Sequence, residues 1–199
     1  PADQKKAALL TIEAAQLVRF KDNTDSAQKA ISLLDAATSL DSNNFLAWEN
    51  KLMFYYPLKQ KEKLLEVYTQ LIRIRPGAYD LYQRIGFQYD EWGDTVNAIL
   101  NYNKAAQICK TSLDTMSTAN KDYSSLAYNP VISLIMAGDS TGAAKLLKKY
   151  IHEIPSDNPG RLQDIRFLEG LSRKGIWEGI RTGREKEGGG KWKYGGVSI

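Results

Sequence analysis

The stretch YQRIGFQYDEWGDTVNAILNYNKAA, residues 82–106, places small and aromatic residues at regular intervals. Four residues of its first half follow the i, i+3, i+4, i+7 spacing of one helix face: Tyr82, Ile85, Gly86 and Tyr89. The pair Gly93-Asp94 predicts the end of this helix, because glycine accepts a positive φ at a helix C-terminus and aspartate is a preferred N-cap. The first half of the stretch therefore predicts a helix followed by a tight turn.

The second half repeats the pattern at Ala98, Tyr102 and Ala105, which lie at i, i+4 and i+7. Gly86 and Ala98 are small, so two antiparallel helices can approach closely where these residues meet. The tyrosines would fill the space around that contact. The whole stretch therefore predicts an antiparallel helix pair.

The same pattern recurs when the sequence is shifted against itself by 34 residues. A period of this length predicts stacked units, each made of two helices. Three rows of residues align in this way: Ala30, Leu64 and Ala98; Leu34, Tyr68 and Tyr102; Ala37, Leu71 and Ala105.

The segment from Tyr82 to Ala105 resembles a tetratricopeptide repeat (TPR), the 34-residue helix–turn–helix unit with the pattern W-x2-L-G-x2-Y…A-x3-F…P. The preceding unit matches this pattern at Trp48, Tyr55, Tyr68 and Pro76, although Leu52 and Leu64 replace its small residues. The resemblance implies an all-α, right-handed superhelical solenoid of about four helix pairs plus a C-terminal capping helix. It also implies one repeat domain over residues 1–183.

The expected repeats cover residues 7–42, 43–76, 77–110 and 124–155. The first is degenerate, as terminal repeats often are. The fourth aligns Gly138-Asp139 with Gly93-Asp94 at an offset of 45 rather than 34, so 11 extra residues fall near residues 110–120. They would form either a longer helix or an inserted loop. We expect Pro130 to begin or kink the leading helix of this repeat.

Beyond the repeats, the sequence predicts a capping helix over about 159–173 and a glycine-rich, basic tail over 184–199. Pro159 suits the first turn of a helix. The apolar face of the capping helix would consist of Leu162, Ile165, Leu168 and Leu171. The tail shows no periodicity and is expected to be irregular, with Trp192, Tyr194 and Val197 as anchors.

The composition is that of a globular protein, with 199 residues of which 43% are hydrophobic. The chain has 27 basic and 23 acidic residues, which gives a net charge of +4. Residues 161–199 hold 9 of the basic and 5 of the acidic residues, so the net charge comes entirely from this C-terminal segment. The neutral charge of residues 1–160 argues against a nucleic-acid partner.

The sequence contains no run of about 18 apolar residues, so it predicts no transmembrane segment. A chain that begins with Pro1 leaves open a preceding export signal or lipid anchor.

Residues suited to catalysis are few, so we expect no enzyme activity, cofactor or metal. His152 and Cys109 are the only histidine and cysteine, and Cys109 is interpreted as a small buried residue. Asp90 and Glu91 are adjacent and would project about 100° apart on a helix, so they do not converge as an acid and a base. We interpret them as a solvated helix end.

The TPR resemblance implies a partner-binding face on the leading helix of each repeat. The residues concerned lie one, five or eight places after the start of that helix, and some could pack against the capping helix or tail instead. The expected peptide-binding residues are Arg19, Glu49, Met53, Tyr56, Gln83, Phe87, Asp90, Tyr128 and Ile132.

This face predicts the chemistry of its ligand. TPR domains that bind the C-terminal carboxylate of heat-shock chaperones have lysine and asparagine at the matching positions. This chain has Glu49 and Met53 there, so a carboxylate ligand of this kind is not expected. An apolar, aromatic and partly acidic face suits an extended or helical peptide with apolar anchors and a basic residue. Lys191 and Lys193 of the tail would complement Glu49 or Asp90, so the tail could bind its own chain or a neighbouring copy.

Two functions fit the sequence. The first is a non-catalytic protein–protein interaction module that binds a protein segment or peptide. The alternative is a structural or assembly subunit, including a lipid-anchored cell-envelope protein, whose repeats mediate self-association. The sequence leaves the compartment open between the cytoplasm and, if a signal was removed, the periplasm or a membrane surface.

Overall fold

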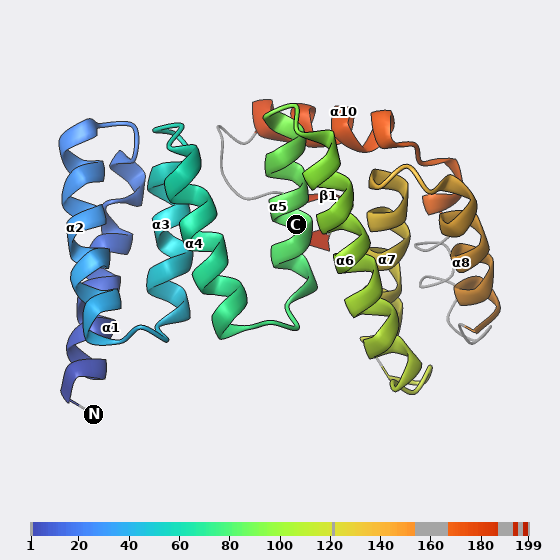
Figure 1. Cartoon of the computed structure of the whole chain (residues 1–199), viewed down its shortest axis with the longest axis horizontal. Coiled ribbons are helices and arrows are strands. Elements are labelled where there is room, and N and C mark those ends of the chain that lie inside the picture. The colour runs from blue at the N-terminus through green and yellow to red at the C-terminus, as the bar shows by residue number, and fades with distance from the viewer. Residues whose placement is uncertain (1, 121, 154–166, 187–192, 195–196, 199) are drawn as a thin grey trace. The chain divides into compact units, whose positions relative to one another are not determined.

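The computed structural model describes residues 2–120, 122–153, 167–186, 193–194 and 197–198, and it is all-α apart from one short hairpin (Figure 1). No strand occurs within residues 2–120 or 122–153. The fold consists of two compact units, Pro1–Gly77 and Ala78–Ile199. The predicted all-α fold of antiparallel helix pairs is confirmed, whereas a single domain over 1–183 stays a prediction.

The first unit holds two helix pairs. Its elements are α1 (Ala2–Gln16), η1 (Val18–Phe20), α2 (Thr24–Leu40), α3 (Phe45–Tyr55) and α4 (Lys61–Ile74). Asparagine caps begin two of these helices: the Asn23 side chain accepts from the Ser26 amide at 2.9 Å, and the Asn44 side chain accepts from the Ala47 amide at 3.0 Å. These bonds satisfy amides that the first turn of a helix leaves without partners.

The second unit holds two further pairs and a C-terminal helix. Its elements are α5 (Tyr79–Glu91), α6 (Thr95–Asp114), α7 (Tyr123–Met136), α8 (Ser140–Glu153), η2 (Phe167–Gly170), α10 (Arg173–Lys186), β1 (Lys193–Tyr194) and β2 (Val197–Ser198). β1 and β2 pair antiparallel.

The two Gly-Asp turns of this unit have the same geometry. Gly93 has φ +78° and Gly138 has φ +85°. The side chains of Asp94 and Asp139 then accept from the backbone amides of Asn97 at 3.1 Å and Gly142 at 2.8 Å. The 45-residue alignment of the third and fourth repeats is therefore correct in structural terms.

The rows found at the 34-residue period form the cores of the helix pairs. All nine of their members are buried. Gly86 contacts the Tyr102 ring so closely that an added Cβ would lie 2.6 Å from its Cε1 atom. The predicted close approach of α5 and α6 thus occurs at Gly86, and it is filled by the side chain of Tyr102.

The insertion between the third and fourth repeats takes both of its predicted forms. α6 continues to Asp114, and a loop then precedes α7. The prediction for Pro130 was wrong in one respect, because α7 already begins at Tyr123 and holds Pro130 in its interior. Proline removes one helical hydrogen bond there, but Pro130 is buried in the unit and packing retains the helix.

The sequence did not predict α10, which follows the segment in which the capping helix was expected. Residues 154–166 are outside the described part, which includes most of the helix expected at 159–173. Residues 167–170 form a 3-10 helix, and α10 begins at Arg173, capped by the Ser172 hydroxyl, which accepts from the Gly175 amide at 3.1 Å. α10 and the hairpin also replace part of the irregular tail expected over 184–199. The side chains of Trp192 and Tyr194, on which the expected docking of the tail depends, lie outside the described residues.

Candidate functional site

The C-terminal end of α5 carries a buried carboxylate. The side chain of Asp90 is only 5% exposed. Its Oδ2 atom accepts from the Tyr102 hydroxyl at 2.9 Å, and its Oδ1 atom forms an ion pair with the Arg173 guanidinium of α10. The interpretation of Asp90 as a solvated helix end was therefore wrong, because a cation 83 residues further along the chain compensates its charge.

Tyr102 is held in its neutral form at this site. Burial raises the pKa of Tyr102, and the negative charge of Asp90 and the hydrogen bond to it raise the pKa further. The Arg173 guanidinium acts in the opposite direction. The phenol therefore stays a hydrogen-bond donor to Asp90 throughout the neutral range.

Beside Asp90, the site consists of aromatic and aliphatic contacts. The Phe87 ring meets the rings of Tyr102 and Trp177 edge-on, with centroids 5.5 Å apart in both pairs. From α10, Ile176 is fully buried and Ile180 is 6% exposed, and both belong to the hydrophobic core of this unit. α10 therefore packs through an arginine, an aromatic ring and two isoleucines.

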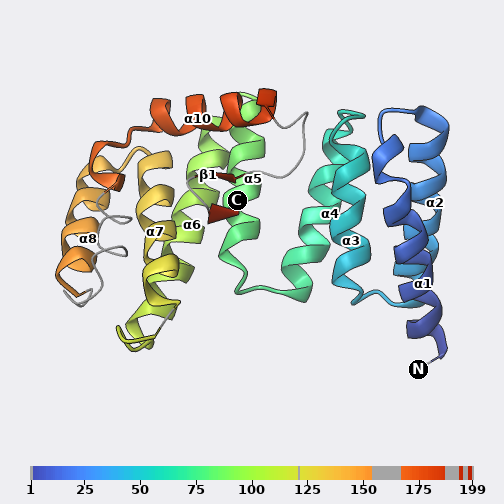
Figure 2. The ribbon, with the colours of Figure 1, turned by 180° about the vertical axis from the view of Figure 1, so that it is seen from behind.

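α10 lies across the C-terminal ends of α5 and α7 (Figures 1 and 2). Two of the expected peptide-binding residues, Phe87 and Asp90, are thus covered by a helix of the same chain. We refer to Phe87, Asp90 and Tyr102 together as the α10 site.

Three further expected binding residues lie on α5 and α7. The Gln83 amide donates to the Asn129 carbonyl at 3.2 Å and to the Ser133 hydroxyl at 2.9 Å, and Gln83 is 1% exposed. Ile132 is 2% exposed, and Tyr128 is half-buried. Gln83 therefore joins α5 to α7, and neither Gln83 nor Ile132 faces solvent.

The first unit leaves its expected binding residues more open. Arg19 is exposed on η1, with its guanidinium 4.8 Å from the centroid of the Phe20 ring. Glu49 and Met53 are half-buried on α3, and Tyr56, just after α3, is 40% exposed. Three apolar side chains on α1 and α3 are also exposed, namely Leu9, Ile12 and Leu46.

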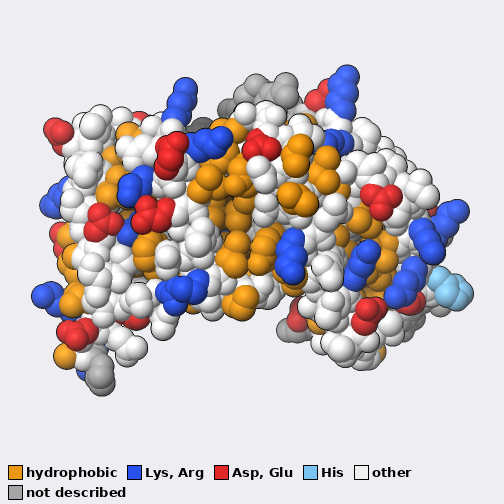
Figure 3. Space-filling view, in the orientation of Figure 1, with side chains coloured by type: hydrophobic (Ala, Val, Ile, Leu, Met, Phe, Trp, Pro, Cys, Tyr) orange, Lys and Arg blue, Asp and Glu red, His pale blue; other side chains and the backbone are white. Residues whose placement is uncertain are grey.

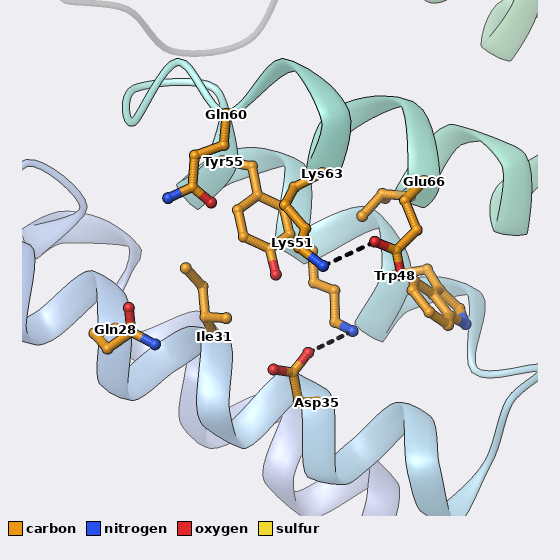
Figure 4. A pocket seen from close by; sticks show the side chains of 10 residues that line it. Gln28, Ile31, Asp35, Trp48, Lys51, Tyr55, Gln60, Lys63 and Glu66 are labelled. Carbon is orange, nitrogen blue, oxygen red and sulfur yellow. Dashed lines mark hydrogen bonds and ion pairs between the residues drawn. The ribbon is translucent and has the colours of Figure 1, made fainter.

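A cavity of about 260 Å³ lies between α2, α3 and α4 in the first unit (Figure 4). The ammonium of Lys51 points into this region, donates to Asp35 at 2.8 Å and Thr38 at 3.0 Å, and lies 4.1 Å from the centroid of the Trp48 ring. At the rim, Lys63 pairs with Glu66 at 2.9 Å.

The charges around this cavity are balanced. This side of the first unit carries acidic and basic side chains mixed together (Figure 3). Because both lining lysines have carboxylate partners within 2.9 Å, the cavity does not present the basic clamp that would hold a free carboxylate. We interpret Lys51 as a residue that joins α2 to α3.

Cys109 and His152, the residues considered for nucleophilic or acid–base chemistry, do not lie in surroundings that suit such chemistry. Cys109 is fully buried, and burial raises the pKa of its thiol, so the reactive thiolate is disfavoured. His152 is exposed in the last turn of α8. Within the described residues, no group of three or more His, Cys, Asp and Glu side chains converges as a metal site would require.

The contribution of α10 was not predicted from the sequence. Its contact residues follow the i, i+3, i+4, i+7 helix spacing, which the pattern could have revealed: Arg173, Ile176, Trp177 and Ile180. Glycines at positions 175, 179 and 183 obscured this signal, because glycine is a poor helix former.

Comparisons with known proteins find similarity at the level of structure. No protein-family model matches the chain, and no curated protein matches its sequence. Among solved structures, the chain is similar to a crystal structure of PilW, described as a widely conserved type IV pilus biogenesis factor. The TM-score is 0.42 and the sequence identity is 16%, over 90% of this chain and 92% of that chain.

None of the helices in the described parts of the chain combines the length and the apolar content needed to span a lipid bilayer.

Proposed function

We propose that this chain is a non-catalytic, TPR-like protein-interaction module that binds a segment of a partner protein on the faces of its leading helices. The observation that supports this most strongly is the position of α10, which is a helix bound at Phe87 and Asp90, two positions expected to face a partner. A face that binds a helix of its own chain has the shape and chemistry to bind a helix of another.

The proposed binding residues form one set in each unit. In the first unit they are Arg19, Glu49, Met53 and Tyr56, and exposed apolar residues on α1 and α3 would add area to this set. In the second unit they are Phe87 and Asp90, which α10 covers, and Tyr128, whereas the buried Gln83 and Ile132 are not proposed to contact a partner. The proposal involves no cofactor and no nucleic acid.

Site-specific photo-cross-linking tests the proposal. A benzophenone amino acid would replace Met53 or Tyr56 in the first unit. Matched controls would carry it at Lys29 of α2 or Thr69 of α4, which are exposed in the same unit but do not lie on a leading helix. We expect cross-links to a distinct partner from Met53 and Tyr56, and none from the two control positions.

Purified components then decide between the two candidate functions. With the identified partner, Met53→Ala combined with Tyr56→Ala should weaken binding about tenfold or more, because buried aromatic and apolar anchors dominate interface energies. Cross-links only between copies of this chain would favour the assembly role. Equal cross-linking from leading-helix and control positions would contradict a specific leading-helix face.

A further inference from the structure

We propose that α10 is a displaceable occupant of its site, and that the site recognises an amphipathic partner helix with the chemistry of α10. Such a helix carries an arginine followed three, four and seven residues later by an aliphatic, an aromatic and an aliphatic residue. This inference rests on the proposed function and specifies the class of partner for the second unit.

The polar half of the site selects for a cation. Asp90 is a nearly buried carboxylate with one oxygen on Tyr102 and the other on Arg173. The Arg173 side chain is 31% exposed, so this position can be reached from solvent. A helix without a cation here would leave the carboxylate buried and uncompensated, which is strongly unfavourable. A basic residue is therefore required at this position of any competing helix, and arginine occupies it here.

The apolar half of the site fixes the spacing of the remaining anchors. Trp177 meets Phe87 at a centroid distance of 5.5 Å, and Ile176 and Ile180 enter the core of the unit. These three residues lie four, three and seven positions after Arg173, so one face of a helix supplies the cation and all the apolar contacts. The arrangement corresponds to recognition of a helix through i, i+3, i+4 and i+7 anchors.

α10 has a low intrinsic tendency to be helical, which favours its release. Its 14 residues include Gly175, Gly179 and Gly183. In a helix interior, each glycine lowers the helical population by roughly fivefold relative to alanine. A partner helix without these glycines would lose less conformational entropy on binding, so it could compete with a segment that is tethered at high local concentration.

A peptide of residues 171–186, LSRKGIWEGIRTGREK, provides the probe. Its binding to the full chain would be measured by fluorescence anisotropy of a labelled copy. We expect the Trp177→Ala chain, whose own α10 is weakly held, to bind the peptide about tenfold or more tightly than the wild-type chain. Lys174→Ala is the matched control, because its side chain is 86% exposed on the same helix, and it should leave binding unchanged.

Two substitutions test whether α10 and the peptide compete for the site, one in α10 of the chain and one in the peptide. Gly175→Ala should strengthen the chain's own α10 and weaken peptide binding about threefold to fivefold, because the nearest atom to the added Cβ is the Ser172 hydroxyl at 3.4 Å. Within the peptide, Arg173→Glu should reduce binding to the Trp177→Ala chain by about tenfold or more, because it places two carboxylates together.

Native-state hydrogen exchange of the wild-type chain covers the case in which Trp177→Ala fails to fold. We expect the amides of α10 to exchange through a local opening that leaves α5 and α6 protected. Exchange of α10 only through global unfolding would overturn the proposal, and so would a folded Trp177→Ala chain that binds the peptide no better than wild type.

These outcomes are separate from those that test the proposed function. A partner that cross-links at Met53 and Tyr56 while α10 stays fixed would leave the function standing and remove this inference. Binding of the peptide at the α10 site, without any cross-link from Met53 or Tyr56, would support a displaceable α10 and contradict the proposed function of the first unit.

Discussion

At the scale of single residues, Gly86 is fixed by its contact with Tyr102. The Tyr102 ring is fully buried and hydrogen-bonded to Asp90, so it cannot move aside for a Cβ placed 2.6 Å from its Cε1 atom. We therefore expect Gly86→Ala to lower the free energy of unfolding by about 1–3 kcal/mol, although alanine is the better helix former. Urea unfolding followed by circular dichroism measures this change.

Gly175→Ala is the matched control for Gly86→Ala. Both glycines are helical, but an added Cβ at Gly175 meets only the Ser172 hydroxyl, at an ordinary contact distance of 3.4 Å. This substitution should stabilise α10 by about 0.5–1 kcal/mol. If the two substitutions had the same effect on unfolding, the close approach of α5 and α6 could not be the reason for glycine at position 86.

At the scale of elements, the Gly-Asp turns define where one helix ends and the next begins. Gly93 has φ +78°, and nothing lies within 4 Å of an added Cβ, so only the backbone conformation disfavours alanine there. We expect Gly93→Ala to destabilise the second unit by about 1–2 kcal/mol. Gly77 also has open space around it but no positive φ, so Gly77→Ala should change the unfolding free energy little.

The sequence predicted those features of the helices that depend on residue spacing and on local caps. The row of Leu34, Tyr68 and Tyr102 is buried as the 34-residue period indicates, and Asp94 caps α6 as expected. The suggestion that Pro130 begins α7 was wrong, because Pro130 lies in the interior of that helix, although α7 begins at Tyr123, close to the start expected for the fourth repeat at residue 124. In that case packing in the unit overrode local propensity.

The candidate site was less predictable, because its contacts join distant parts of the chain. Asp90 meets Arg173, which is 83 residues away, and Gln83 meets Ser133, which is 50 residues away. No local spacing links these positions. The repeat pattern correctly placed Phe87 and Asp90 on a leading helix, but it could not indicate that α10 covers them.

At the scale of the whole molecule, buried tyrosines make stability depend on alkaline pH. Burial raises the pKa of Tyr79 to about 12, and it also raises the pKa of Tyr102, Tyr123 and Tyr150. A phenol with a folded-state pKa above its unfolded value of about 10 contributes stability fully below pH 10 and loses it as the pH rises towards the folded value. The chain should therefore unfold more easily above about pH 10.

Urea titrations between about pH 8 and pH 11.5 would measure this loss. Each such tyrosine adds a slope of up to about 1.4 kcal/mol per pH unit above pH 10, so Tyr102→Phe should make the decline shallower by about that amount. An unfolding free energy that stayed constant up to pH 11.5 would show that these phenols ionise freely in the folded state.

The proposed function requires that the leading helices bind a partner segment, and hydrogen exchange of the complex measures this. The full chain would be compared with and without the partner that cross-links at Met53 and Tyr56. We predict slower exchange along α3, α5 or α7, and faster exchange in α10 if that helix is displaced. The second helix of each pair, namely α2, α4, α6 and α8, should change little. Protection confined to those second helices, or no protection in any leading helix, would show that the leading helices do not bind the partner.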